Sequence, residues 1–116
     1  MDLYDWSSLP SDQLTPTIAR KTIHRANITL ARLELKRGAA VAEHSHIHEQ
    51  VSMVLQGALK FVVAGREQIV RSGELLALAS GVPHGVLETL EDAVVVDIFS
   101  PVREDWIRGD DAYLRR

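Results

Sequence analysis

Three histidines and a glutamine lie within seven residues, in the run His44-Ser45-His46-Ile47-His48-Glu49-Gln50. The whole chain has only five histidines, so this clustering is the first feature that points to chemistry. If residues 44–46 are extended, the imidazoles of His44 and His46 point to the same side, because side chains alternate across a strand. Two neutral nitrogen donors on one face make half of a transition-metal site.

A further imidazole can come from His84, which directly follows the loop sequence Gly81-Val82-Pro83. Together with the first cluster it gives three nitrogen donors and one oxygen donor: His44, His46, His84 and Gln50. Such a set suits one divalent ion of Zn, Ni, Fe, Mn or Co. All four groups are neutral, so the site would keep the full charge of the ion, which favours Lewis-acid chemistry on an anionic or carbonyl-bearing ligand.

The other two histidines are interpreted as non-ligands. His48 has the strand parity of His46 but falls at a local turn, which places it at the rim of the site, and the second non-ligand is His24. A structural interpretation of the cluster also stays open. A strand histidine is often exposed or structural, and a glutamine such as Gln50 is more often a hydrogen-bonding residue than a metal ligand.

One acidic residue, Asp97, interrupts the apolar run 93–99. In an extended strand it shares one side with Ala93, Val95 and Phe99. Burying an ionised carboxylate is unfavourable unless the group has a partner, so Asp97 is either a functional residue or half of a buried ion pair. The nearest downstream cation is Arg103.

Short apolar segments separated by turn residues fill the middle of the chain. They predict strands over residues 17–23, 26–36, 50–55, 58–63, 67–70, 74–78, 84–90 and 93–99. The expected turns are Gly57, Gly65-Arg66 and Glu91-Asp92. This pattern, without a convincing long helix, predicts an all-β sandwich or closed barrel. We expect a loose N-terminal arm over 1–16, the barrel over 17–100, and a C-terminal segment over 101–116 with one helical turn and a frayed, charged end.

The strand after the histidine cluster is apolar on both faces. Gln50, Ser52 and Val54 share the interior side, while Val51 and Met53, with Leu55, face away. A strand that is wet on one side would alternate with polar residues, so the outward face is expected to be covered as well. The edge of a second sheet, the N-terminal arm or another subunit could cover it, and of these a second subunit, as in a homodimer, is favoured.

The composition narrows the class of protein. With 116 residues the chain forms one domain, and a net charge of −3 gives no electrostatic reason to expect nucleic acid or an anionic membrane. There is no cysteine, so disulfides and thiolate metal sites are excluded. The N-terminus is acidic and no apolar run reaches the roughly 20 residues of a membrane span. A cytoplasmic protein is expected.

The spacing around both histidine groups resembles the two cupin motifs. Gly38, five residues, His44-Ser45-His46, three residues, Gln50, six residues and Gly57 match the first motif, with glutamine where glutamate is commoner. The second motif is matched by Gly73 and residues 79–84, with alanine where proline is usual at 79. The resemblance implies a cupin double-stranded β-helix, a jelly-roll barrel with the metal in its mouth.

The histidine run and residues 94–106 are also similar to the KdgF-type pectin-degradation cupins. Those enzymes convert 4,5-unsaturated monouronates to linear 5-keto-4-deoxyuronates. The resemblance implies His44, His46, Gln50 and His84 as metal ligands, Asp97 and Arg103 as catalytic or substrate-binding residues, and Phe99 in the pocket wall. The substrate would be an anionic sugar acid. A cupin oxygenase, a non-catalytic small-molecule-binding cupin and a structural role are the alternatives.

Overall fold

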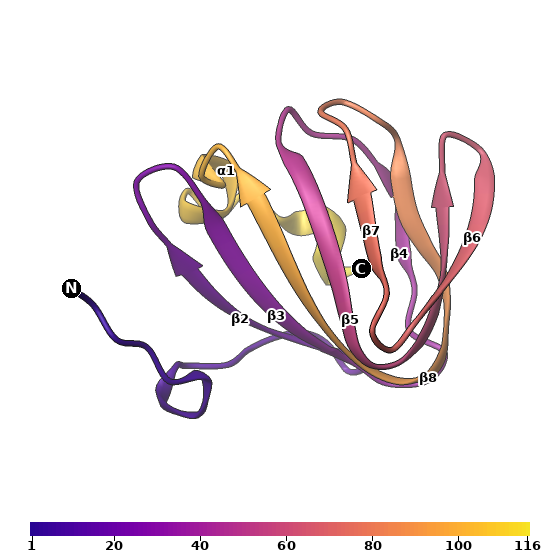
Figure 1. Ribbon diagram of the computed structural model, residues 1–116, viewed down its shortest axis with the longest axis horizontal. Coiled ribbons are helices and arrows are strands. Elements are labelled where there is room, and N and C mark those ends of the chain that lie inside the picture. The colour runs from indigo at the N-terminus through magenta and orange to yellow at the C-terminus, as the bar shows by residue number, and fades with distance from the viewer.

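All 116 residues are described in the computed structural model, and almost all regular structure in it is antiparallel β (Figure 1). Eight strands form one hydrogen-bonded sheet in the order β1-β2-β3-β8-β5-β6, with β4 added to β8 and β7 added to β5. The elements are η1 (Trp6–Ser8), β1 (Asp12–Thr15), β2 (Ile18–His24), β3 (Thr29–Leu35), β4 (Val41–His44), β5 (Glu49–Val63), β6 (Arg66–Arg71), β7 (Leu75–Leu78), β8 (His84–Ser100), α1 (Glu104–Ile107) and η2 (Ala112–Arg115). The all-β prediction is confirmed, and no helix has the length and apolar character of a membrane span.

Two long strands, β5 and β8, form the centre of the sheet to which the other strands are added. They pair along their entire length, from Glu49 opposite Ser100 to Val63 opposite His84. One half of this ladder continues into β3, β2 and β1 on one side and β7 on the other, while the other half continues into β4 and β6. The ladder bends in the middle, so the two halves of the sheet face each other as in a jelly roll (Figure 1).

The bend in this ladder replaces two turns that the sequence predicted. Neither Gly57 nor Glu91-Asp92 reverses the chain, because each lies inside one continuous strand. The β5–β8 register shifts three times between Val54 and Leu59, and such bulges bend a strand without ending it. The hairpin after β5 also differs by one residue, since its two turn residues with positive φ are Ala64 and Gly65.

Glycine is required at the bend for two separate reasons. Gly57 has φ +81°, and a Cβ atom there would lie 2.3 Å from the carbonyl oxygen of Asp92. Gly57→Ala is therefore expected to lower the free energy of unfolding by about 2–4 kcal/mol, the sum of backbone strain and overlap. Gly73→Ala is the matched control, because Gly73 has φ +88° but open space around its Cβ position, so about 1 kcal/mol is expected. Urea unfolding measures both, and equal losses would contradict the overlap argument.

The core fills the space between the two facing halves. Apolar side chains from β2, β3, β5 and β8 form it, including Ile18, Leu33, Leu59 and Val95, which are all buried. Gln50, Ser52 and Val54 point inward as predicted and are buried. Leu55 is 51% exposed and Val51 and Met53 are only partly covered, so the homodimer stays a prediction.

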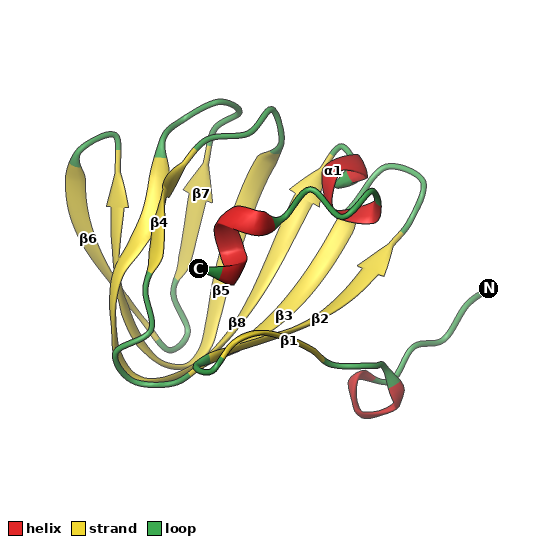
Figure 2. Ribbon diagram, turned by 180° about the vertical axis from the view of Figure 1, so that it is seen from behind, coloured by secondary structure: helices red, strands yellow, loops and turns green.

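Both chain ends are more ordered than the sequence suggested. Residues 12–15, inside the expected arm, form β1 at the edge of the sheet. The C-terminal segment lies across the opening between the two halves of the sheet (Figure 2). Its end is not frayed: Leu114 is buried in the core, and Arg115 forms ion pairs with Asp111 and Asp12. The charged residues of this segment thus attach it to the sheet instead of keeping it exposed to solvent.

Candidate metal centre

Three imidazoles meet at the mouth of the folded sheet. His44 ends β4 and His84 begins β8, and the two are direct partners in the β4–β8 pairing. His46 follows in the loop before β5. One ring nitrogen from each of the three lies within 4.8 Å of the others, which is close enough for a single ion to contact all three. His24 and His48 lie outside this cluster, as predicted.

Backbone carbonyls fix which nitrogen of each ring is free. The Nδ1 atoms of His44, His46 and His84 lie 2.8, 3.1 and 2.9 Å from the carbonyl oxygens of Ala42, His48 and Val82. A carbonyl can only accept, so each Nδ1 carries the proton and each Nε2 has a free lone pair. Burial lowers the pKa of all three histidines, that of His46 to about 4, so all three are neutral at pH 7.

Two contacts at the centre are unfavourable unless a cation joins them. His46 Nε2 lies 3.1 Å from Oε1 of Gln50, which places a lone pair opposite a lone pair when the imidazole is neutral. The Nε2 atom of His84 is buried and has no hydrogen-bond partner at all. Unpaired buried polar atoms are unfavourable. A divalent metal ion would satisfy both, so the four residues fit such an ion.

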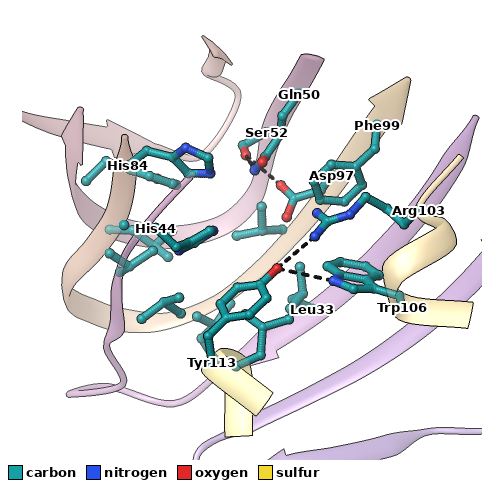
Figure 3. Close-up of a pocket in the computed structure, with 18 residues that line it drawn as sticks. Leu33, His44, Gln50, Ser52, His84, Asp97, Phe99, Arg103, Trp106 and Tyr113 are labelled. Atoms are coloured by element: carbon teal, nitrogen blue, oxygen red, sulfur yellow. Dashed lines mark hydrogen bonds between the residues drawn. The ribbon is translucent and has the colours of Figure 1, made fainter. Parts of the chain in front are cut away.

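Hydrogen bonds connect Gln50 to the acidic residue in the same pocket (Figure 3). Gln50 Nε2 donates to Ser52 Oγ over 3.0 Å, and Ser52 Oγ donates to Asp97 Oδ1 over 2.6 Å. Burial raises the pKa of Asp97 to about 6, although the Ser52 hydrogen bond and the Arg103 charge oppose the shift. The sequence predicted the inward position of Ser52 but not this connecting role, because its partner lies 45 residues away.

Arg103 is only 1% exposed and pairs with Asp105, not with Asp97. Its Nε and Nη2 atoms donate to the two oxygens of Asp105 over 3.0 and 2.8 Å, leaving Nη1 without a hydrogen bond. Its guanidinium lies over the rings of Phe99 and Trp106, at 4.6 and 4.2 Å. The buried ion pair that was the structural alternative for Asp97 is therefore absent, and Asp97 has no direct cationic partner.

The C-terminal segment places two aromatic residues beside the centre, and the sequence predicted no role for either. Trp106 lies between two guanidiniums, with Arg20 at 4.5 Å and Arg103 at 4.2 Å from its ring. Tyr113 packs against His44, with ring centroids 4.5 Å apart and ring planes tilted by 39°. Nothing in the sequence signalled Tyr113, because the end of the chain was expected to be frayed.

One pocket contains most of these groups (Figure 3). Its polar wall consists of His44, Gln50, Ser52, His84, Asp97, Arg103 and Tyr113, and its base of apolar core residues such as Leu33 and Leu59. Phe99 is in the wall, as predicted. The pocket thus combines neutral imidazoles, a carboxyl group of raised pKa and a buried guanidinium. Such convergence of polar groups in an apolar pocket is typical of an enzyme site.

Comparisons with known proteins identify a family and a shared fold. A family model described as "Cupin domain" matches residues 31–99. The pectin degradation protein KdgF of Dickeya dadantii (strain 3937) is 30% identical over 100 residues, which cover 84% of this chain and 91% of that protein. The solved structure of KdgF from Halomonas sp. has a TM-score of 0.85 at 28% identity, covering 91% of this chain and 98% of its own. An RmlC-like cupin from Shewanella frigidimarina NCIMB 400 has the same TM-score at 22% identity, covering 91% and 96%, which shows the shared fold.

Proposed function

The chain belongs to the cupin family and is related to KdgF, and we propose that it is a metal-dependent enzyme that converts 4,5-unsaturated monouronates to linear 5-keto-4-deoxyuronates. One observation carries the proposal: Asp97 and Arg103 share a pocket with His44, Gln50 and His84, and neither neutralises the other. A general base is thus free to act on a bound sugar acid, and Arg103, although paired with Asp105, keeps Nη1 free to bind its anionic group.

The residues that would hold the ion are His44, His46, His84 and Gln50. When bound, a divalent transition metal supplies Lewis-acid stabilisation of negative charge on a substrate oxygen. The pKa values of the three histidines are lowered, so protons do not compete with the metal for the ligand nitrogens at neutral pH.

Asp97 would serve as the general base for ring opening. Its carboxylate takes the proton of the anomeric hydroxyl, a C1–O double bond forms, and the bond from C1 to the ring oxygen breaks. The electron pair moves to the former ring oxygen, which becomes part of an enolate, and protonation at C4 gives the ketone at C5. Atoms balance as an isomerisation, so no oxidant is required. A pKa near 6 suits Asp97 both for accepting and for returning a proton near neutral pH.

Arg103 would bind the substrate carboxylate. Asp105 occupies its Nε and one of its two Nη atoms and so fixes the plane of the guanidinium, while Nη1 is left free to donate. Phe99 supports the guanidinium from one face and closes the pocket wall. The substrate is thus held by its charge while Asp97 reaches the anomeric end.

The test follows the absorbance of the conjugated unsaturated uronate. Metal-loaded protein is expected to abolish the absorbance of 4,5-unsaturated galacturonate, and protein treated with EDTA is expected to be at least about a hundredfold slower. Adding back Zn, Ni, Fe or Mn should restore the rate. A full rate in EDTA, or no loss of absorbance with metal-loaded protein, would contradict the proposal. Oxygen uptake with substrate would instead indicate a cupin oxygenase.

A further inference from the structure

The hydroxyl group of Tyr113 has no role in the function proposed above, yet it lies in the same pocket (Figure 3). The ring comes from η2 at the end of the chain and packs against the His44 ring, with 4.5 Å between the ring centroids. Its Oη atom is 2.8 Å from Arg103 Nη2 and 3.2 Å from Trp106 Nε1. The residue thus joins the C-terminal segment to the groups that would bind substrate.

The hydrogen bonds of Tyr113 Oη determine where its O–H proton can point. A phenol oxygen donates once and can accept about twice. Arg103 Nη2 and Trp106 Nε1 are both donors that cannot accept, so they fill the acceptor positions of Oη. No acceptor within the protein takes the remaining O–H proton. That proton is available to an acceptor inside the pocket.

Three ion pairs, of which one is buried, hold this hydroxyl in position. Asp111 precedes η2, is buried, and receives a 2.8 Å hydrogen bond from Arg20 on β2, which is also buried. Arg115 bonds the same carboxylate and also Asp12 on β1, and Leu114 inserts into the core. A helical turn of four residues has little stability alone, so these contacts fix Tyr113 against the sheet before any ligand arrives.

We propose that Tyr113 is a further substrate-binding residue, whose O–H donates a hydrogen bond to the carboxylate of the bound sugar acid. The inference rests on the proposed function and adds a second donor beside Arg103 Nη1. Accepting a hydrogen bond from a guanidinium polarises the phenol and strengthens its own donation, and an anionic oxygen is the acceptor that gains most from it. Tyr113 and Arg103 together would select a uronate over a neutral sugar.

Tyr113→Phe tests this directly, because it removes one oxygen and keeps the ring. On unsaturated galacturonate, kcat/KM is expected to fall roughly tenfold to a hundredfold, mainly through KM, with metal content unchanged. The chain has only one other tyrosine, Tyr4, which is exposed on the N-terminal arm. Tyr4→Phe is therefore the matched control and should keep the wild-type rate. A Tyr113→Phe rate within twofold of wild type would overturn the inference.

A double-mutant cycle separates contact with substrate from bracing of Arg103. Arg103→Lys keeps a cation but removes the planar fork that Tyr113 would brace. If Tyr113 contacts the substrate, the Tyr113→Phe penalty persists in the Arg103→Lys background. A penalty that vanishes there shows that Tyr113 acts only through Arg103, and the inference is then wrong.

Calorimetric titration with D-galacturonate, which lacks the double bond and cannot react, separates this inference from the proposed function. Tyr113→Phe is expected to weaken galacturonate binding about tenfold and to leave the binding of neutral D-galactose unchanged. If the wild type is inactive on unsaturated uronates but shows this pattern, the proposed function fails and the inference holds. Equal effects on both sugars, or no galacturonate binding by the wild type, would overturn the inference.

Discussion

Replacing His84 by alanine is expected to remove the metal and, with it, all measurable turnover. His84 is buried at the start of β8, its Nδ1 is anchored on the carbonyl of Val82, and its buried Nε2 has no partner within the protein. Without it, two imidazoles and one amide remain, a set that binds divalent ions far more weakly. We expect turnover to fall at least about a thousandfold and metal content, measured by elemental analysis, to fall to near zero.

The same substitution should change the stability of metal-loaded protein. An ion that binds only the folded state stabilises it by about 4 kcal/mol at a thousandfold excess over its dissociation constant. Added metal should therefore raise the unfolding midpoint of the wild type and leave that of His84→Ala unchanged. His24→Ala is the control for metal content, because His24 bonds Thr29 and lies outside the cluster. Stoichiometric metal in purified His84→Ala would rule out His84 as a ligand.

Asp97→Asn is expected to lower kcat by about a hundredfold to ten-thousandfold while metal content stays unchanged. The amide has nearly the shape of the carboxyl group and can still accept the hydrogen bond of Ser52, so the pocket keeps its form. It cannot take a proton from the substrate, which isolates the role of a base. Steady-state rates on unsaturated galacturonate measure the effect, and a rate near that of the wild type would contradict the assignment of Asp97 as the base.

The buried carboxyl group also predicts how stability depends on pH. Folding raises the pKa of Asp97 from its ordinary 3.8 to about 6, so between these values the folded state binds the extra proton. Wild-type stability from this group therefore falls as pH rises through that window. The stability of Asp97→Asn relative to wild type should increase by about 1 kcal/mol between pH 5 and pH 7.5. Denaturant unfolding in EDTA measures this, and a difference that does not change with pH would contradict the buried, raised pKa.

The parts of the candidate metal centre that could be predicted depend on residues close together in the sequence. Strand alternation places Gln50 and Ser52 on the interior side, and the structure confirms that face. His44 and His46 are two residues apart, so short-range geometry predicted their common direction, whereas His84 joins them only through the pairing of β4 with β8. The inward face of β8 that holds Asp97 and Phe99 was likewise visible from alternation.

What the sequence could not provide depends on partners far along the chain. A glycine such as Gly57 favours a turn or a bulged bend equally well, and only its approach to Asp92 on β8 decides between them. The charges of Asp111 and Arg115 are typical of a solvated chain end. Their structural role becomes clear only in the folded protein, where Asp111 pairs with Arg20 and Arg115 pairs with Asp12. Tyr113 gains its position in the pocket from those same pairings.

The bent β5–β8 ladder determines whether folding or metal binding comes first. Gln50 lies at one end of that ladder and His84 at the other, so the two approach each other only after the sheet has folded over. Pairings such as Glu49 with Ser100 join residues distant in sequence, and contacts of this kind form slowly. In a newly synthesised chain the four candidate ligands are therefore brought together only when the core is assembled. A metal ion held by these residues would therefore bind only after the sheet has folded.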